Sequence, residues 1–132
     1  MKLRYALIAE YANVTGDGKL NLMGVTDRLY AFQFPAIHRD LIIVNSLETE
    51  NDEDGSNQSV HIQLIDSDGR TLTEVTGQIL IQGGRQVFNQ IHVFQDVHFA
   101  QPGAYQINVS FSGQQQAILD LELIQIQQPE VV

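Results

Sequence analysis

Apolar and polar residues alternate along most of this chain, which is the pattern of β-strands that bury one face. The clearest case is residues 105–112, where every odd position is apolar and every even position is polar. Turn residues such as Asp66-Ser67-Asp68-Gly69 separate the segments. Similar patterns cover residues 58–66, 71–82, 90–99 and 117–127. Together with the strands described below, they predict eight strands and no helix.

The first two predicted strands form a hairpin. The odd residues Leu3, Tyr5, Leu7, Ala9 and Tyr11 share one face, and a turn through Asp17-Gly18 leads to a second strand. If the hairpin pairs odd residues of the first strand with even residues of the second, Leu20 and Leu22 lie on that same apolar face. Gly24 interrupts the second strand, which predicts a bulge or a close approach of two backbones.

Two segments depart from simple alternation. Residues 41–44 are Leu-Ile-Ile-Val, a continuous apolar run that predicts a central strand covered on both faces. In the last strand, Ile124 and Ile126 lie on the face opposite Leu119, Leu121 and Leu123. A last strand with two apolar faces predicts an edge that a second copy of the chain covers.

These elements predict a single-domain, antiparallel β-sandwich over residues 1–132, immunoglobulin-like or C2-like. The segment Pro102-Gly103-Ala104-Tyr105 opens a late strand and is typical of a tyrosine corner, in which the phenol hydroxyl bonds to upstream backbone. A plain core tyrosine at the start of a strand explains the same residues equally well, so both interpretations stay open.

Charge and composition exclude several classes of protein. The formal net charge is −9, with 7 basic and 16 acidic residues, so DNA, RNA and anionic membrane surfaces are not expected partners. No apolar run approaches the roughly 20 residues that span a bilayer. The apolar stretch after Arg4 ends at Glu10, too early for a secretory signal, so a cytoplasmic location is expected. With no cysteine, thiolate metal sites and disulfides are excluded.

The densest charge, from Glu48 to Asp54, predicts either a solvated hairpin tip or a calcium loop, because Ca²⁺ takes several oxygen ligands. If the strands simply alternate in direction, Asp17 lies at the same end, and Asp17, Asp52 and Asp54 are the candidate ligands of a C2-like calcium module. A zinc site is a weaker alternative. Strict alternation places His92, Phe94, Asp96 and His98 on one face, opposite Val97 and Phe99. Asp96 and His98 could then share an ion with a third ligand.

Motifs for catalysis are missing from the sequence: there is no Gly-x-Ser-x-Gly elbow, no cysteine and no phosphate-binding loop. The adjacent His38, Arg39 and Asp40 give the best location for a small hydrolase-type site, in a predicted connection from Phe32 to Asp40. Asp27 and Arg28 are interpreted as a buried ion pair rather than as a holder of a ligand carboxylate. No cofactor is expected.

The opening of the chain resembles a known family. The segments Ala9-Glu10-Tyr11-Ala12-Asn13-Val14, Gly18-Lys19-Leu20-Asn21-Leu22-Met23-Gly24-Val25, Asp27-Arg28 and Phe34-Pro35-Ala36 are similar to a widespread family of small bacterial and archaeal proteins known only as a domain of unknown function. The similarity continues through Asp66-x-Asp68-Gly69 and Gly103-x-Tyr105. The resemblance implies a stand-alone β-sandwich in a prokaryotic cytoplasm, and it implies no substrate, cofactor or catalytic residue.

The sequence therefore predicts a non-enzymatic binding or assembly module that self-associates, with a homodimer favoured. The alternatives are a calcium module that uses Asp17 and residues 48–54, and an enzyme with a site near His38. Five residues are expected to serve the fold rather than a site: Gly24, Asp27, Arg28, Gly103 and Tyr105.

Overall fold

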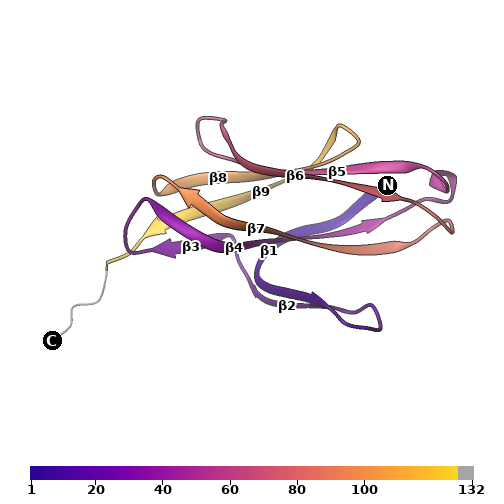
Figure 1. The fold of residues 1–132 in the computed structure, drawn as a ribbon, viewed down its shortest axis with the longest axis horizontal. Helices are drawn as coiled ribbons and strands as arrows, with labels where there is room; N and C mark the ends of the chain where they lie inside the picture. Colours follow the sequence, from indigo (N-terminus) through magenta and orange to yellow (C-terminus); the bar gives the residue numbers. More distant parts are fainter. Residues whose placement is uncertain (128–132) are drawn as a thin grey trace.

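The computed structural model describes residues 1–127 of the 132-residue chain. As the alternating pattern predicted, the structure is all-β, and two sheets pack around one apolar core. Sheet A has the strand order β2-β1-β4-β7, and sheet B has the order β3-β9-β8-β5-β6 (Figure 1). The strands are β1 (Lys2–Val14), β2 (Leu20–Val25), β3 (Arg28–Ala31), β4 (Ala36–Glu48), β5 (Asn57–Ile65), β6 (Thr71–Leu80), β7 (Val87–Phe99), β8 (Gly103–Phe111) and β9 (Gln114–Gln125), with a short 3-10 helix, η1 (Asn51–Glu53), after β4.

The core between the sheets follows the period of two. In β8 the odd residues from Tyr105 to Phe111 are all buried, and they face Leu41, Ile43 and Leu47 of β4. Full burial of each such side chain contributes about 1.5–3 kcal/mol relative to an exposed position. Apolar burial along one face of each sheet therefore explains why these segments are strands. Within residues 1–127, no helix is long and apolar enough to cross a membrane.

The prediction of eight antiparallel strands was wrong in one element. The structure has nine strands over residues 1–127, and the additional strand is β3, which runs parallel to β9 with Arg28 beside Glu122. Leu29 of β3 packs against the core, whereas Arg28 and Tyr30 are exposed. Four residues carry too little alternation to be recognised in a sequence.

The predicted role of β9 as an uncovered edge was also wrong. β9 lies between β8 and β3, and the backbone amide of Ile126 donates to the carbonyl oxygen of Ala31 at 2.9 Å. The second apolar face of β9 therefore does not mark a free edge, and it gives no reason to expect self-association.

β4 is the predicted central strand, because β1 and β7 flank it and every residue from Leu41 to Leu47 is buried. Sheet B covers only one of its faces. Leu41, Ile43 and Leu47 belong to the core between the sheets, whereas Ile42 and Val44 lie on the opposite face of sheet A.

Two irregularities change which face a residue occupies. In the β1–β2 hairpin, Ala12 pairs with Leu22 and Val14 with Leu20, so these leucines lie opposite the face of the odd β1 residues, and the predicted register was wrong. In β7, Asp96 adopts a positive φ of 53°. The alternation reverses there, so Phe94 is buried in the same core as Val97 and not on the opposite face as predicted.

Candidate functional site

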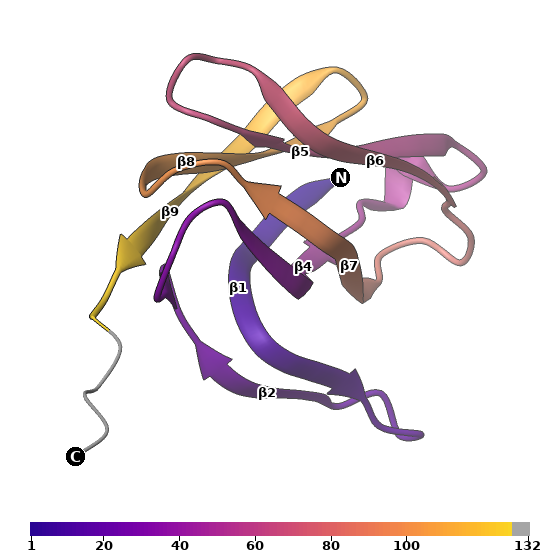
Figure 2. The ribbon, with the colours of Figure 1, turned by 60° about the vertical axis from the view of Figure 1, so that its left-hand side comes forward.

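A two-stranded ribbon extends from sheet A. β1 pairs with β4 from Lys2 to Ala9, and with β2 from Ala9 to Val14. Beyond Ala9, β1 and β2 therefore pair only with each other among the strands of residues 1–127, and we call residues 10–25 the β1–β2 ribbon. Figure 2 shows that β1 bends along its length, so that the ribbon turns away from sheet B. An isolated two-stranded ribbon is at best marginally stable in water.

Apolar side chains occupy both faces of this ribbon. On one face, Tyr11, Met23 and Val25 are 52%, 66% and 59% exposed. On the other face, Val14 is 45% exposed, and Ala12, Leu20 and Leu22 are half-buried. None of these seven side chains is among those packed on the core between the sheets within the described chain. The ribbon thus presents apolar surface that its own fold does not cover.

The ribbon face that carries Tyr11, Met23 and Val25 continues across all four strands of sheet A, where its central members Ala9, Ile42 and Val44 are buried within the single copy. Paired residues point to the same side of a sheet, so the pairs Ala9–Val25, Ala9–Ile42 and Ile42–Val93 define one row of side chains on the side away from sheet B. Neighbouring rows add Leu7, Val44 and Ile91. We call this surface the outer face, and its apolar members are Tyr5, Leu7, Ala9, Tyr11, Met23, Val25, Ile42, Val44, Ile91 and Val93.

Polar residues end the outer face along the strand direction. Ser46 and Asn89 lie in the row of Tyr5, and Asn13 pairs with Asn21 beyond Tyr11. The Asn21 side chain donates to Asn13 at 3.0 Å, and Arg4 donates to the Ser46 hydroxyl at 3.1 Å. An apolar centre with a polar rim is the usual composition of a protein interface.

Gly24 lies at the base of the ribbon, next to the predicted irregularity. Its φ is +66°, and a Cβ at this position would lie 2.8 Å from Cγ and Cδ of Glu10 on the paired strand. Glycine alone tolerates both conditions without strain. Gly24 therefore leaves space for the Glu10 side chain where the ribbon begins. The predicted bulge or close approach of two backbones was wrong, because the β1–β2 pairing has no register shift and the nearest atoms belong to a side chain.

The proposed calcium ligands are not brought together. β4 runs antiparallel to β1, so Lys2 lies beside Glu48, and Asp17 follows the opposite end of β1. Hydrogen bonds from Thr15 and Lys19 hold the pKa of the Asp17 carboxyl below its usual value. In the part of the chain that the structure describes, no three His, Asp or Glu side chains, including Asp52 and Asp54 or Asp96 and His98, form a group that could hold a metal ion.

The acidic loop is instead joined to the turn between β6 and β7. The backbone amides of Gly83 and Arg85 donate at 3.0 Å to the side chains of Asp54 and Asn51. The Arg85 guanidinium donates to Glu48 at 2.7 Å. The carboxylates of Glu48 and Asp54 thus connect the acidic loop to the β6–β7 turn, and the loop is not only a solvated tip.

The predicted buried pair of Asp27 and Arg28 was wrong. The two side chains are 3.7 Å apart, but they are 75% and 57% exposed. They line an open hollow of about 590 Å³ on sheet B, together with Asp66, Asp120 and Glu122. In β3 the side chain that packs against the core is that of Leu29, and its neighbour Arg28 is exposed. The hollow is acidic, but among residues 1–127 its carboxylates form no group of three that could hold a metal ion.

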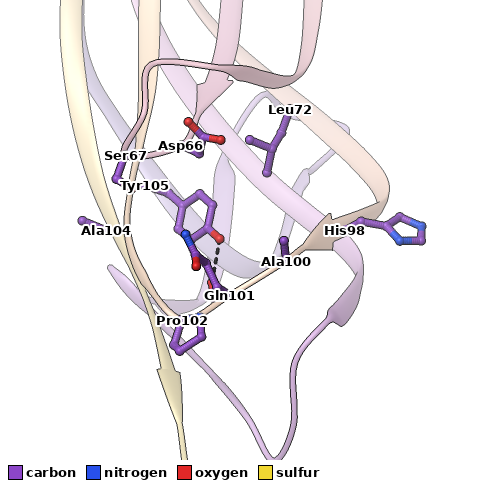
Figure 3. A pocket seen from close by; sticks show the side chains of 9 residues that line it. All are labelled: Asp66, Ser67, Leu72, His98, Ala100, Gln101, Pro102, Ala104 and Tyr105. Atoms are coloured by element: carbon purple, nitrogen blue, oxygen red, sulfur yellow. Dashed lines mark hydrogen bonds between the residues drawn. The ribbon is translucent and has the colours of Figure 1, made fainter.

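A smaller hollow surrounds Tyr105 (Figure 3). The Tyr105 hydroxyl donates to the carbonyl oxygen of Gln101 at 2.6 Å, the geometry of a tyrosine corner, and its ring meets Phe99 edge to face at 4.9 Å. Burial raises the pKa of Tyr105. Gly103 begins β8 with a φ of 131°. The volume is about 100 Å³, below the roughly 300–1,000 Å³ of small-molecule sites, and the His98 ring points away from Tyr105.

The residues of the enzyme alternative lie in a strand and not in a connection. β4 begins at Ala36, so His38, Arg39 and Asp40 follow each other along it, where His38 is half-buried and Arg39 and Asp40 are exposed. The neighbouring hollow is lined by residues 32, 33 and 35–37, and His38 is not part of that lining.

Comparison with known proteins gives a family without an assigned activity. A family model described as "Family of unknown function (DUF6941)" matches residues 4–124. The chain belongs to this family. This membership confirms the resemblance that the opening segments indicated. A search of curated proteins finds no match to this chain.

Among solved structures, the chain is similar to the Pseudomonas fluorescens alkylpurine DNA glycosylase AlkC bound to DNA containing an abasic site analog. The identity is 15% and the TM-score is 0.44, and the match covers 89% of this chain and 30% of the glycosylase. A likeness at this level carries no argument about fold or activity.

Sequence reasoning missed the outer face, although part of its signal was visible. The odd residues from Leu3 to Tyr11 were expected to share an apolar face, and Tyr5 to Tyr11 do. Leu3 instead packs on the core between the sheets, because the pairing of β1 with β4 shifts between Leu3 and Tyr5. The structure adds that this face points away from sheet B and continues through Met23, Ile42 and Val93. Only the pairing of distant strands brings these residues together.

Proposed function

We propose that this protein is a non-enzymatic assembly module whose copies associate through the outer face of sheet A and the β1–β2 ribbon. The observation that carries the proposal is the ribbon itself, a two-stranded element with apolar side chains on both faces, none of which packs on the core within the described residues. Burial of these side chains in a contact would supply the packing that two strands alone lack.

A second copy of the chain is the partner that the charge distribution favours. The protein carries a net charge of −9, so two copies repel each other over most of their surfaces. The paired rows of the outer face that contain Tyr5, Leu7 and Ala9 include no charged residue. A two-fold contact presses one patch against itself, and a neutral patch avoids opposing like charges.

Further features support the binding role over the alternatives. The acidic hollow at Asp27 and Arg28 is exposed, and the hollow at Tyr105 is small. The excess of acidic residues disfavours nucleic acid as a partner. We keep the expectation of a cytoplasmic protein. An immunoglobulin-like sandwich is supported by the hydrogen bond of Tyr105 to Gln101.

The test is a charge placed on the outer face, with a matched control on the other sheet. Met23 is 66% exposed on β2, and Leu80 is 57% exposed on β6, so Met23→Lys and Leu80→Lys change equally accessible positions. Light scattering and sedimentation velocity then measure the mass of each protein. We expect Met23→Lys to weaken association by about 2 kcal/mol, roughly 30-fold in Kd, as for a central interface residue.

Leu80→Lys should associate like the wild type. A wild-type protein that is monomeric at high micromolar concentration contradicts the proposal. Equal association of the wild type, Met23→Lys and Leu80→Lys would also contradict it, because the ribbon would then not be the contact.

A further inference from the structure

The free edge of β7 is a second surface for contact between copies. β7 is the last strand of sheet A, and β4 is its pairing partner on the other side. We propose that β7 pairs antiparallel with β7 of a second copy, so that two sheets A join into one sheet of eight strands. This contact goes beyond the one through the ribbon and rests on a different observation.

The other three sheet edges are short, distorted or charged within their length, whereas the distorted and charged position of β7, Asp96, lies near its C-terminal end. Natural proteins protect edges by shortness, charge, proline or distortion of the backbone. β3 has four residues, β2 has six and contains Gly24 at positive φ, and β6 carries Glu74. β7 has 13 residues, and from Val87 to Gln95 it contains no charged residue and no proline. It is therefore the strand edge most open to pairing in the described chain.

The pairing of β7 with β4 fixes which backbone groups are free. The amide of Thr49 donates to the carbonyl oxygen of Gln86 at 2.8 Å, just before β7 begins. Hydrogen-bonded and non-hydrogen-bonded pairs alternate in an antiparallel ladder. The backbone amide and carbonyl groups of the even residues of β7 therefore point toward β4, and those of the odd residues point toward the free edge. Asp96 interrupts the strand with its positive φ. The usable edge thus runs from Val87 to Gln95, and its centre is Ile91.

A two-fold axis at Ile91 gives a compatible register. Ile91 then pairs with Ile91 of the second copy, Asn89 with Val93, and Gln90 with His92. No two acidic side chains face each other in this register. The outer faces of the two copies also become one continuous surface. Together with the contact through the ribbon, the two two-fold contacts predict an assembly of four copies.

A proline on the free edge tests this contact separately. Asn89→Pro removes an amide that faces outward, and a proline is tolerated in a strand at such a position. Asn89→Ala is the matched control, since it keeps the amide. By light scattering we expect four copies for the wild type and for Asn89→Ala. Asn89→Pro and Met23→Lys should each give two copies, and the double variant should give one.

The two proposals fail in different ways. If Met23→Lys is monomeric, the β7 contact is wrong and the ribbon contact stands. If Asn89→Pro is monomeric while Met23→Lys still forms a dimer, the β7 contact stands and the ribbon contact is wrong. If Asn89→Pro keeps the wild-type mass, the β7 contact is wrong.

Cysteine crosslinking provides a second measurement that does not need the proline variant to fold. The chain has no native cysteine. In the Met23→Lys background, Ile91→Cys should give a crosslinked dimer on mild oxidation, because paired residues lie within disulfide distance. Val93→Cys should not crosslink to itself, since its copy lies four residues away along the strand, about 13 Å. Equal crosslinking at both positions, or none at Ile91→Cys, would overturn the register.

Discussion

Gly24→Ala tests whether the base of the ribbon needs glycine. At a φ of +66°, an alanine would occupy the left-handed region, and its Cβ would lie 2.8 Å from two carbons of the Glu10 side chain. Both effects act on the folded protein. They are separable because one depends on the backbone of Gly24 and the other on the side chain of Glu10.

The backbone effect costs about 1–2 kcal/mol, the usual penalty for an L-residue in this conformation. The contact adds about 0.5 kcal/mol, a low value because Glu10 is exposed and its side chain can rotate away. The total is about 1.5–2.5 kcal/mol. At roughly 2.1 cal/mol/K per residue, the unfolding entropy of this chain is about 280 cal/mol/K, so the melting temperature should fall by about 5–9 °C.

A double-mutant cycle measured by thermal and urea unfolding, at one low protein concentration, separates the two effects. Glu10→Ala alone should change stability by less than about 0.5 kcal/mol, as expected for an exposed side chain. In the Glu10→Ala background, Gly24→Ala should lose only the backbone part. The reasoning is refuted if Gly24→Ala leaves the melting temperature unchanged.

Three further predictions concern the fold. Tyr105→Phe removes the bond to Gln101 and should cost about 1 kcal/mol in urea unfolding; equal stability would remove the tyrosine corner from the account. Asp66→Ala removes the acceptor of the Asp68 and Arg70 amides, each at 2.9 Å, and should cost about 1 kcal/mol, whereas Asp66→Asn keeps an acceptor oxygen and should lose less. Burial lowers the pKa of His92 below its unfolded value of 6.5. The contribution of neutral His92 to the free energy of unfolding should therefore be fully present above pH 6.5 and should fall as the pH drops below that value. His92→Gln should flatten that part of the stability profile.

The sequence was sufficient for segments that bury one face. In β8 and β5 the alternation predicted which side chains are buried, because successive side chains of a strand point to opposite faces and one face of each strand packs on the core along its length. Phe94 shows the limit. A single left-handed residue, Asp96, reverses the alternation, and the sequence gives no local signal for that conformation at an aspartate within a strand.

The interaction surface could be predicted only in part. Tyr5 to Tyr11 formed a visible apolar face, but the sequence does not say whether such a face meets the second sheet or solvent. The direction of β4 depends on the unpredicted β3, and that direction separates Asp17 from the acidic loop. Both errors concern how distant strands pair, which depends on contacts that local periodicity does not encode.

Isotope-filtered NMR on a mixture of ¹³C-labelled and unlabelled copies tests the central claim most directly, because it detects only contacts between molecules. The account predicts intermolecular NOEs from the methyl groups of Met23 and Val25 to protons of the outer face of a second copy. A spectrum without such NOEs, from a sample that light scattering shows to be associated, would contradict the ribbon contact.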